Sequence, residues 1–168
     1  MGQYVGLCIK FSGSPRSSQN VRAEREAIAI DDMTSRRVLV ISYEPELIEL
    51  VKLILTRSRN DQVIAAYGGQ EGLVKAEQDP PDLIILTILM PELDGWEVYA
   101  RLKAIPSLAS IPVLFQAALA SSRAYPLVKQ AGAQGYLCLP YYPQDLLAAR
   151  DAVLRGETYY PPFPEKAH

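Results

Sequence analysis

The stretch PDLIILTILMPELDGW, residues 81–96, decides the fold of this 168-residue chain. Residues 83–86 form a continuous apolar run with two isoleucines, which predicts a strand covered on both faces. Asp94 and Gly95 predict a turn, and residues 96–102 take up helical spacing after it. A buried strand, a loop and a helix in this order indicate one unit of an α/β fold.

The same alternation extends in both directions along the chain. Further strands are predicted at residues 37–41, 62–66, 111–115 and 135–138. Helices are predicted from Pro45 onward and at residues 69–79, 95–104, 121–131 and 143–155, the fourth of them weakened by Pro126. Strands that alternate with helices predict a five-stranded parallel sheet with helices on both faces, in the flavodoxin-like (βα)5 order 2-1-3-4-5.

The predicted domain occupies residues 36–155. Residues 1–35 read as an N-terminal arm, and two interpretations stay open for it. It is either a poorly ordered segment upstream of a start at Met33, or an arm that docks on the domain or on a partner. Residues 156–168 read as an extended tail rich in proline and tyrosine, too short for a second domain.

Composition narrows the class of protein. With 49% hydrophobic and 21% charged residues, the chain is typical of a soluble globular domain. Its net charge of −2 gives no general attraction to nucleic acid or membrane, and no apolar run reaches the length of a membrane span. Two cysteines fit the cytoplasm, and the single histidine, His168, disfavours a histidine metal site or a catalytic triad. We therefore expect no enzymatic activity.

The longer segment PDLIILTILMPELDGWEVYARLK, residues 81–103, resembles the third strand, active-site loop and third helix of a response-regulator receiver domain of the CheY-like family. The resemblance covers about residues 36–155. It implies a site where two acidic residues after the first strand hold Mg²⁺ and an aspartate after the third strand accepts a phosphoryl group from a histidine kinase. It also implies a hydroxyl residue after the fourth strand and a lysine after the fifth.

This chain departs from the family at each of those positions. Ser42 and Tyr43 stand at the acidic pair, and Thr87 stands at the phosphoacceptor. Ala117 replaces the hydroxyl residue and Leu139 replaces the lysine. We therefore predict a pseudo-receiver that is not phosphorylated on aspartate and needs neither Mg²⁺ nor another cofactor.

Alternatives remain open at single residues. The Thr87 hydroxyl is interpreted as hydrogen-bonded within a closed pocket, the alternative being a kinase substrate. Tyr43 is expected to fill the emptied ion site, the alternative being a switch. Tyr136 stands at the family's switch aromatic, with either one fixed rotamer or two positions. The resemblance also implies a cis bond at residues 139–140.

Without phosphorylation, function is expected to reside on the surface. The resemblance implies a face made by the fourth helix, fifth strand and fifth helix, which is rich in tyrosine and docks on a signalling partner or on a second copy. The residues expected there are Tyr125, Leu127, Tyr136, Tyr141, Tyr142 and Leu146. The alternative is a ligand sensor that uses the vacated pocket, although the sequence has no glycine-rich phosphate loop.

Overall fold

The computed structural model describes residues 21–23, 25–26, 34–118 and 123–161. Contacts divide the chain into two units, Met1–Asp32 and Met33–His168. The described residues of the first unit are helical, with an ion pair of 2.8 Å between Arg22 and Glu26. Most of the arm predicted at residues 1–35 lies outside the described residues.

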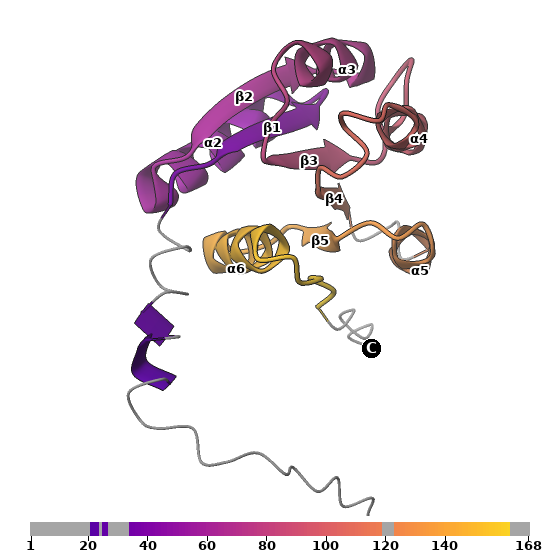
Figure 1. Ribbon diagram of the computed structural model, residues 1–168. Coiled ribbons are helices and arrows are strands. Elements are labelled where there is room, and N and C mark those ends of the chain that lie inside the picture. The colour runs from indigo at the N-terminus through magenta and orange to yellow at the C-terminus, as the bar shows by residue number, and fades with distance from the viewer. Residues whose placement is uncertain (1–20, 24, 27–33, 119–122, 162–168) are drawn as a thin grey trace, which may run out of the picture. The chain divides into compact units, whose positions relative to one another are not determined.

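The second unit is built on a parallel five-stranded sheet in the order β2-β1-β3-β4-β5 (Figure 1). The strands are β1 (Arg37–Ser42), β2 (Gln62–Tyr67), β3 (Leu83–Thr87), β4 (Val113–Ala118) and β5 (Gly135–Leu139). The helices are α2 (Pro45–Arg59), α3 (Gly69–Gln78), α4 (Gly95–Ala104), α5 (Ala124–Gln130) and α6 (Pro143–Leu154). The predicted fold class and strand order are confirmed.

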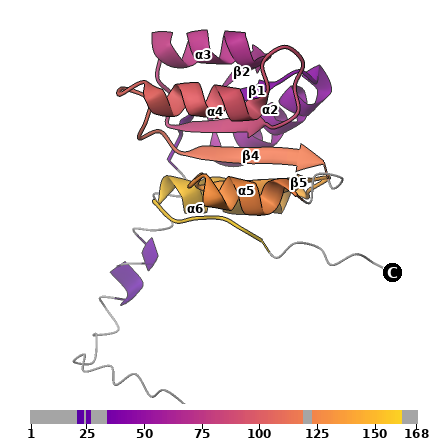
Figure 2. The same cartoon turned by 90° about the vertical axis from the view of Figure 1, so that its right-hand side faces the viewer.

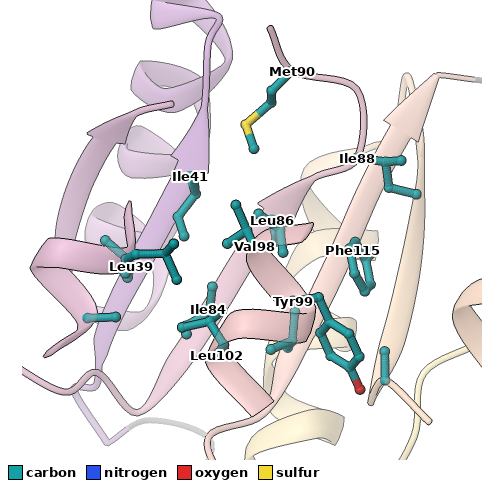
Figure 3. Close-up of a cluster of buried hydrophobic side chains, with 14 of the residues drawn as sticks. Leu39, Ile41, Ile84, Leu86, Ile88, Met90, Val98, Tyr99, Leu102 and Phe115 are labelled. Atoms are coloured by element: carbon teal, nitrogen blue, oxygen red, sulfur yellow. The ribbon is translucent and has the colours of Figure 1, made fainter. Parts of the chain in front are cut away.

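Period-2 alternation in the strands supplies two separate cores. Leu39 and Ile41 of β1 belong to a cluster with α3, α4 and α5, whereas Val38 and Val40 belong to a cluster with α2 and α6. Figure 3 shows the first cluster, in which Val98, Tyr99 and Leu102 of α4 lie beside the side chains of the strands. Helices cover both faces of the sheet (Figure 2), so successive side chains of a strand enter one core or the other, and most of them are apolar.

The bounds of β4 and α5 differ most from the predicted ones, while the other elements differ by at most one residue at an end. β4 begins at Val113 and not at Ile111, because Pro112 has no N–H to donate to a ladder. It continues through Gln116 to Ala118, beyond the predicted apolar run. In α5, Pro126 is the third residue, and the first turn of a helix tolerates a missing N–H. The helix is correspondingly short.

The loop after β3 is fixed by the Asp94-Gly95 pair that the sequence singled out. The Asp94 carboxylate accepts a hydrogen bond of 2.9 Å from the Glu97 amide, so it caps the N-terminus of α4. The Gly95 amide donates to the Ile88 carbonyl at 2.7 Å, and a Cβ on Gly95 would collide with backbone atoms of Thr87 and Ile88. The glycine therefore lets α4 start directly against the end of β3.

A buried ion cluster joins α6 to the opposite, N-terminal edge of the sheet. Arg150, with a side chain only 1% exposed, donates to Asp61 at 2.6 and 3.0 Å and to Asp151 at 2.8 Å. It also donates to the Thr34 carbonyl at 2.8 Å, and Arg59 donates to Asp151 at 2.6 Å. Because every charge in the cluster has an opposite partner, their burial is tolerated.

Candidate functional site

The parallel strands deliver the predicted site residues to one edge of the sheet. Ser42 ends β1, Thr87 ends β3, Ala117 lies next to the end of β4 and Leu139 ends β5. In open α/β sheets this carboxyl edge is where functional sites form. The structure thus brings these four predicted positions to the same edge of the sheet.

Thr87 lies in a polar chain that the sequence did not reveal. The residue is 5% exposed, and its Oγ1 accepts a hydrogen bond of 3.1 Å from Gln116 Nε2. The Tyr141 hydroxyl in turn donates to Gln116 Oε1 at 3.0 Å. Thr87 and Gln116 are direct neighbours in the β3–β4 register, so the two side chains share one face of the sheet. We call these three residues the Thr87 lock.

Burial strengthens the Thr87 lock. Gln116 is fully buried, and its amide oxygen and nitrogen each have a partner within the chain. Burial raises the pKa of Tyr141 well above its usual value, so the hydroxyl remains a donor at any physiological pH. The lock links β3, β4 and the loop after β5 through neutral groups. The hydrogen-bonded interpretation of Thr87 agrees with this geometry.

The acidic-pair positions behave differently from each other. Ser42 is fully buried, and its Oγ accepts a hydrogen bond of 3.3 Å from the Glu44 amide. Tyr43 is 47% exposed, so it does not fill the emptied ion site as expected. A hydrogen bond to Glu44, followed by the charge of that carboxylate, raises the pKa of Tyr43. Tyr43 instead forms part of the wall of a neighbouring cavity.

That cavity has a volume of about 190 Å³ and lies between the ends of β1 and β2 and the loop before α4. Its wall includes Tyr43, Tyr67 and Glu92, together with the residues around the N-terminus of α3. Thr87, Ala117 and Leu139 are not among the residues that line it. The vacated phosphoacceptor position and this cavity are therefore separate places.

The remaining site positions are apolar. Ala117 is 3% exposed and belongs to the core cluster beneath α4 and α5. Leu139 packs against the cluster beneath α2 and α6, and the Leu139–Pro140 bond is cis, as the resemblance implied. Neither side chain has a polar atom with which to hold a phosphoryl oxygen.

The switch position is closed. Tyr136 is fully buried and meets the ring of Tyr125 edge-on, with centroids 5.6 Å apart. Its rotamer is thus the inward one. This geometry agrees with the interpretation of a fixed aromatic.

The predicted interaction face survives only in part. Leu127 is 50% exposed and Tyr142 is 71% exposed, as a contact surface requires. Tyr141 turns inward to the Thr87 lock, and Leu146 is fully buried in the cluster beneath α2 and α6. Leu146 and the fully buried Tyr136 are therefore removed from the predicted surface. Leu146 belongs to the core-facing stripe of α6, which packs on the sheet.

An apolar depression lies beside the exposed part of that face. Trp96, Leu127, Gln130 and Ala131 line a groove of about 430 Å³ between α4 and α5. Leu127 thus belongs both to the predicted face and to this groove.

The described residues contain no group of three or more histidine, cysteine or acidic side chains placed to hold a metal ion. Within the same residues, no helix combines the length and apolar character that a bilayer crossing requires.

Comparison with known proteins adds to this geometry. Residues 38–151 match the family described as the response regulator receiver domain. The chain is 34% identical over 131 residues to the alkaline phosphatase synthesis transcriptional regulatory protein PhoP of Bacillus subtilis, covering 78% of this chain and 53% of PhoP. It is 30% identical over 121 residues to protein PilH of Pseudomonas aeruginosa, covering 71% of this chain and 98% of PilH.

This chain belongs to the response regulator receiver domain family. The receiver fold is also that of the chemotaxis response regulator CheY4 of Vibrio cholerae, with a TM-score of 0.65 and 26% identity over 71% of this chain and 99% of CheY4. The receiver spans about half the length of the first curated relatives, 53% for PhoP and 57% for the transcriptional regulatory protein TrcR of Mycobacterium tuberculosis.

Sequence reasoning missed Gln116 in this receiver. The available signal was a glutamine inside the apolar strand VLFQAA, because a polar residue in a buried strand needs a partner. Its partner Thr87 was already under consideration, but which residue faces it depends on the β3–β4 register. Tyr141 was expected on the surface. Its side chain turns inward because of the path of the chain after Pro140, which the sequence does not show.

Proposed function

We propose that this receiver works without aspartate phosphorylation, as a protein-interaction module of a two-component-type pathway, and that it is not an enzyme. The observation that supports the proposal most directly is the Thr87 lock. It occupies the phosphoacceptor position with a buried, neutral hydrogen-bond chain, so the position is stable without phosphoryl group or metal.

The chemistry of the acceptor position supports the same conclusion. A phosphoaspartate is a mixed anhydride formed on a carboxylate, whereas phosphorylation of the Thr87 hydroxyl would give an ester. Thr87 is 5% exposed as a residue, and its Oγ1 already accepts a hydrogen bond from Gln116. Attack by this oxygen on a phosphoryl donor would require the lock to open.

The residues present do not fit the family's Mg²⁺. Mg²⁺ prefers an octahedron of hard oxygen ligands, several of them carboxylates or waters. At the corresponding positions this receiver offers the Ser42 hydroxyl, which is engaged by the Glu44 amide, and the Thr87 hydroxyl, which is engaged by Gln116. Neither carries a negative charge, so we expect no metal requirement.

The interaction face is proposed on α5, β5 and α6, where Leu127 and Tyr142 are exposed. We call this the signalling face. An exposed leucine and tyrosine beside an apolar groove provide buried area on association, and tyrosine also supplies a polar tip. The proposed partner is a signalling protein of the cytoplasm, such as a histidine kinase or another response regulator, or a second copy of the receiver.

Matched variants test the signalling face. Leu127→Arg with Tyr142→Arg should abolish association, measured by light scattering after size exclusion and by pull-down with candidate signalling proteins from the same genome. Leu50→Arg is the matched control, because Leu50 is 47% exposed and lies on α2, which is not one of the elements of this face. Tyr141→Arg is unsuitable, since it would break the Thr87 lock. Equal loss in the control, or association unchanged in the double variant, contradicts the proposed face.

Ligand sensing is a second candidate, supported by the cavity of about 190 Å³ beside Tyr43 and Tyr67. A sensor would bind a small polar molecule there and reposition the loop before α4. A thermal-shift screen of metabolites tests this function, with Tyr67→Ala as the variant that should lose the response. If no compound raises the melting temperature of the wild type, the ligand-sensing candidate is contradicted.

A further inference from the structure

The chain does not leave the domain where α6 ends. Gly156 has a left-handed φ of 83°, and its amide donates to the Val153 carbonyl at 3.1 Å. The Glu157 amide donates to the Ala152 carbonyl at 3.0 Å. A glycine in this conformation ends the helix and reverses the chain. The following residues therefore run back toward the sheet, as the yellow segment after α6 shows in Figure 2.

Tyr159 pairs with the open edge of β5. Its amide donates to the Gln134 carbonyl at 2.9 Å, and its carbonyl accepts from the Tyr136 amide at 3.0 Å. The two bonds make a parallel bridge between Tyr159 and Gly135. A Cβ on Gly135 would lie 2.8 Å from the Tyr159 carbonyl oxygen, so the glycine permits the close approach.

Tyr160 occupies a cradle beside that bridge. Its hydroxyl donates to the Ala133 carbonyl at 2.6 Å, and its ring meets Tyr125 edge-on at 5.7 Å. The ammonium of Lys129 lies 5.8 Å from the same ring. The Tyr125 hydroxyl donates to the Tyr160 carbonyl at 3.4 Å. Burial raises the pKa of Tyr160 to about 12.

These contacts have the form of peptide recognition by strand addition. In that mode, main-chain hydrogen bonds at a sheet edge hold an extended segment, and a pocket receives one side chain. Here Gln134 and Tyr136 supply the main-chain bonds, and Ala133, Tyr125 and Lys129 surround the tyrosine side chain. Among the described residues after α6, Tyr159 alone is bridged to the sheet edge, so a competing segment has few main-chain bonds to displace.

We propose that the edge of β5 is a docking groove for an extended, tyrosine-bearing segment of a partner protein, and that the receiver's own residues 158–161 occupy it as an autoinhibitory strap. The inference deepens the proposed function, because the groove lies on the signalling face. It rests on that function only for the biological role of the partner. The groove itself is defined by Gly135, Tyr136, Tyr125 and Lys129.

Peptide titration followed by nuclear magnetic resonance tests the groove. The probe is a capped hexapeptide of residues Gly156–Pro161, added to the full chain labelled with nitrogen-15. The open variant is Tyr159→Pro with Tyr160→Ala, which removes the amide donor and the cradled ring. We expect peptide-dependent shifts at Gly135, Tyr136 and Lys129 in the open variant. The wild type should respond about tenfold more weakly, because a tethered strap competes at an effective concentration near the millimolar range.

Two controls make the titration specific. Gly135→Ala placed in the open variant should abolish the response, since its Cβ meets the docked carbonyl at 2.8 Å and also the end of the Leu114 side chain at 2.9 Å, and the spectrum without peptide shows whether the variant keeps its fold. A peptide with serine in place of Tyr160 should bind weakly or not at all. Equal responses of wild type and open variant, or shifts that bypass β5, would overturn the proposal. If the open variant fails to fold, Tyr160→Phe replaces it, and an affinity no higher than that of the wild type would equally overturn it.

The result is independent of the test of the proposed function. The titration requires no signalling partner, and the variants Leu127→Arg and Tyr142→Arg leave the bridge at Tyr159 in place. If the pull-down fails but the peptide still binds, the proposed signalling face is contradicted and the docking groove at β5 stands. Failure of the peptide response with an intact pull-down would remove the groove and retain the signalling face.

Discussion

Replacing Tyr141 by phenylalanine removes one hydroxyl from the Thr87 lock and leaves the ring in place. The hydroxyl donates to Gln116 Oε1 at 3.0 Å, and Gln116 is fully buried. A hydrogen bond of this kind contributes about 0.5–1.5 kcal/mol, but a buried acceptor left without a partner costs about 1–3 kcal/mol. We therefore expect Tyr141→Phe to lower the free energy of unfolding by about 1–3 kcal/mol.

Substitutions of the two other members of the Thr87 lock allow a sharper test of the same hydrogen-bond network. Thr87→Val deprives the Gln116 amide nitrogen of its acceptor, so it should cost a similar amount. Replacing all three at once, as Thr87→Val, Gln116→Met and Tyr141→Phe, removes both sides of each hydrogen bond. Apolar residues of similar shape then fill the space, so the triple variant should lose less than the sum of the single variants.

Urea denaturation at neutral pH measures these differences, with the slope of the transition checked for constancy. A non-additivity of about 0.5–3 kcal/mol is the size expected for residues in one network. Single losses below about 0.5 kcal/mol, the range of ordinary surface substitutions, would refute the buried network. So would strictly additive losses across the three positions.

Three further outcomes follow from the burial of particular side chains. Burial raises the pKa of the Tyr141 hydroxyl in the folded state above its usual 10.0, so the hydroxyl stabilises the fold fully below about pH 10, and this stabilisation is lost as the pH rises further. In urea titrations above that pH, the free energy of unfolding of the wild type should fall by about 1.4 kcal/mol per pH unit more than that of Tyr141→Phe. Arg150→Met strands the buried carboxylate of Asp61 and should cost about 3–5 kcal/mol in the same assay, whereas a loss below about 1 kcal/mol would mean that the cluster is solvated. Leu146→Ala should cost about 2–5 kcal/mol and Tyr142→Ala about 0.5 kcal/mol or less, and the reverse ranking in thermal melts would return Leu146 to the surface.

The strands could be predicted because each has a local cause, and their order followed from the fold class that alternating strands and helices indicate. The run at residues 83–86 is apolar without interruption, as a strand buried on both faces requires. The Asp94-Gly95 pair placed the start of α4 at the right residue, since the aspartate caps the helix and the glycine permits the close turn. The predicted and observed bounds of α4 coincide.

The orientation of α6 could not be predicted from its residues. Leu146 and Leu147 are adjacent, and their side chains point about 100° apart on a helix. Both are leucines in a largely apolar segment, so the sequence does not say which one faces the sheet. The structure buries Leu146 fully and leaves Leu147 at the margin of the core. Only packing against β4, β5 and α2 makes that choice.

The polar features that sequence reasoning missed all join residues distant along the chain. Gln116 and Thr87 are 29 positions apart, and Arg150 and Asp61 are 89 positions apart. The departure of residues 42, 43 and 87 from the family pattern indicated what the pocket lacks. It did not indicate what replaces the lost charges, because that depends on side chains that the fold brings together.

Incubation with acetyl phosphate and Mg²⁺ tests the central claim most directly. Intact mass spectrometry before and after hydroxylamine treatment detects an acyl phosphate, and a receiver with the acceptor aspartate serves as the positive control. The account predicts that this chain gains no phosphoryl group while the control does. A hydroxylamine-labile phosphoryl adduct on this chain, at a yield comparable to that of the control, would contradict a receiver whose acceptor position is closed by Thr87, Gln116 and Tyr141.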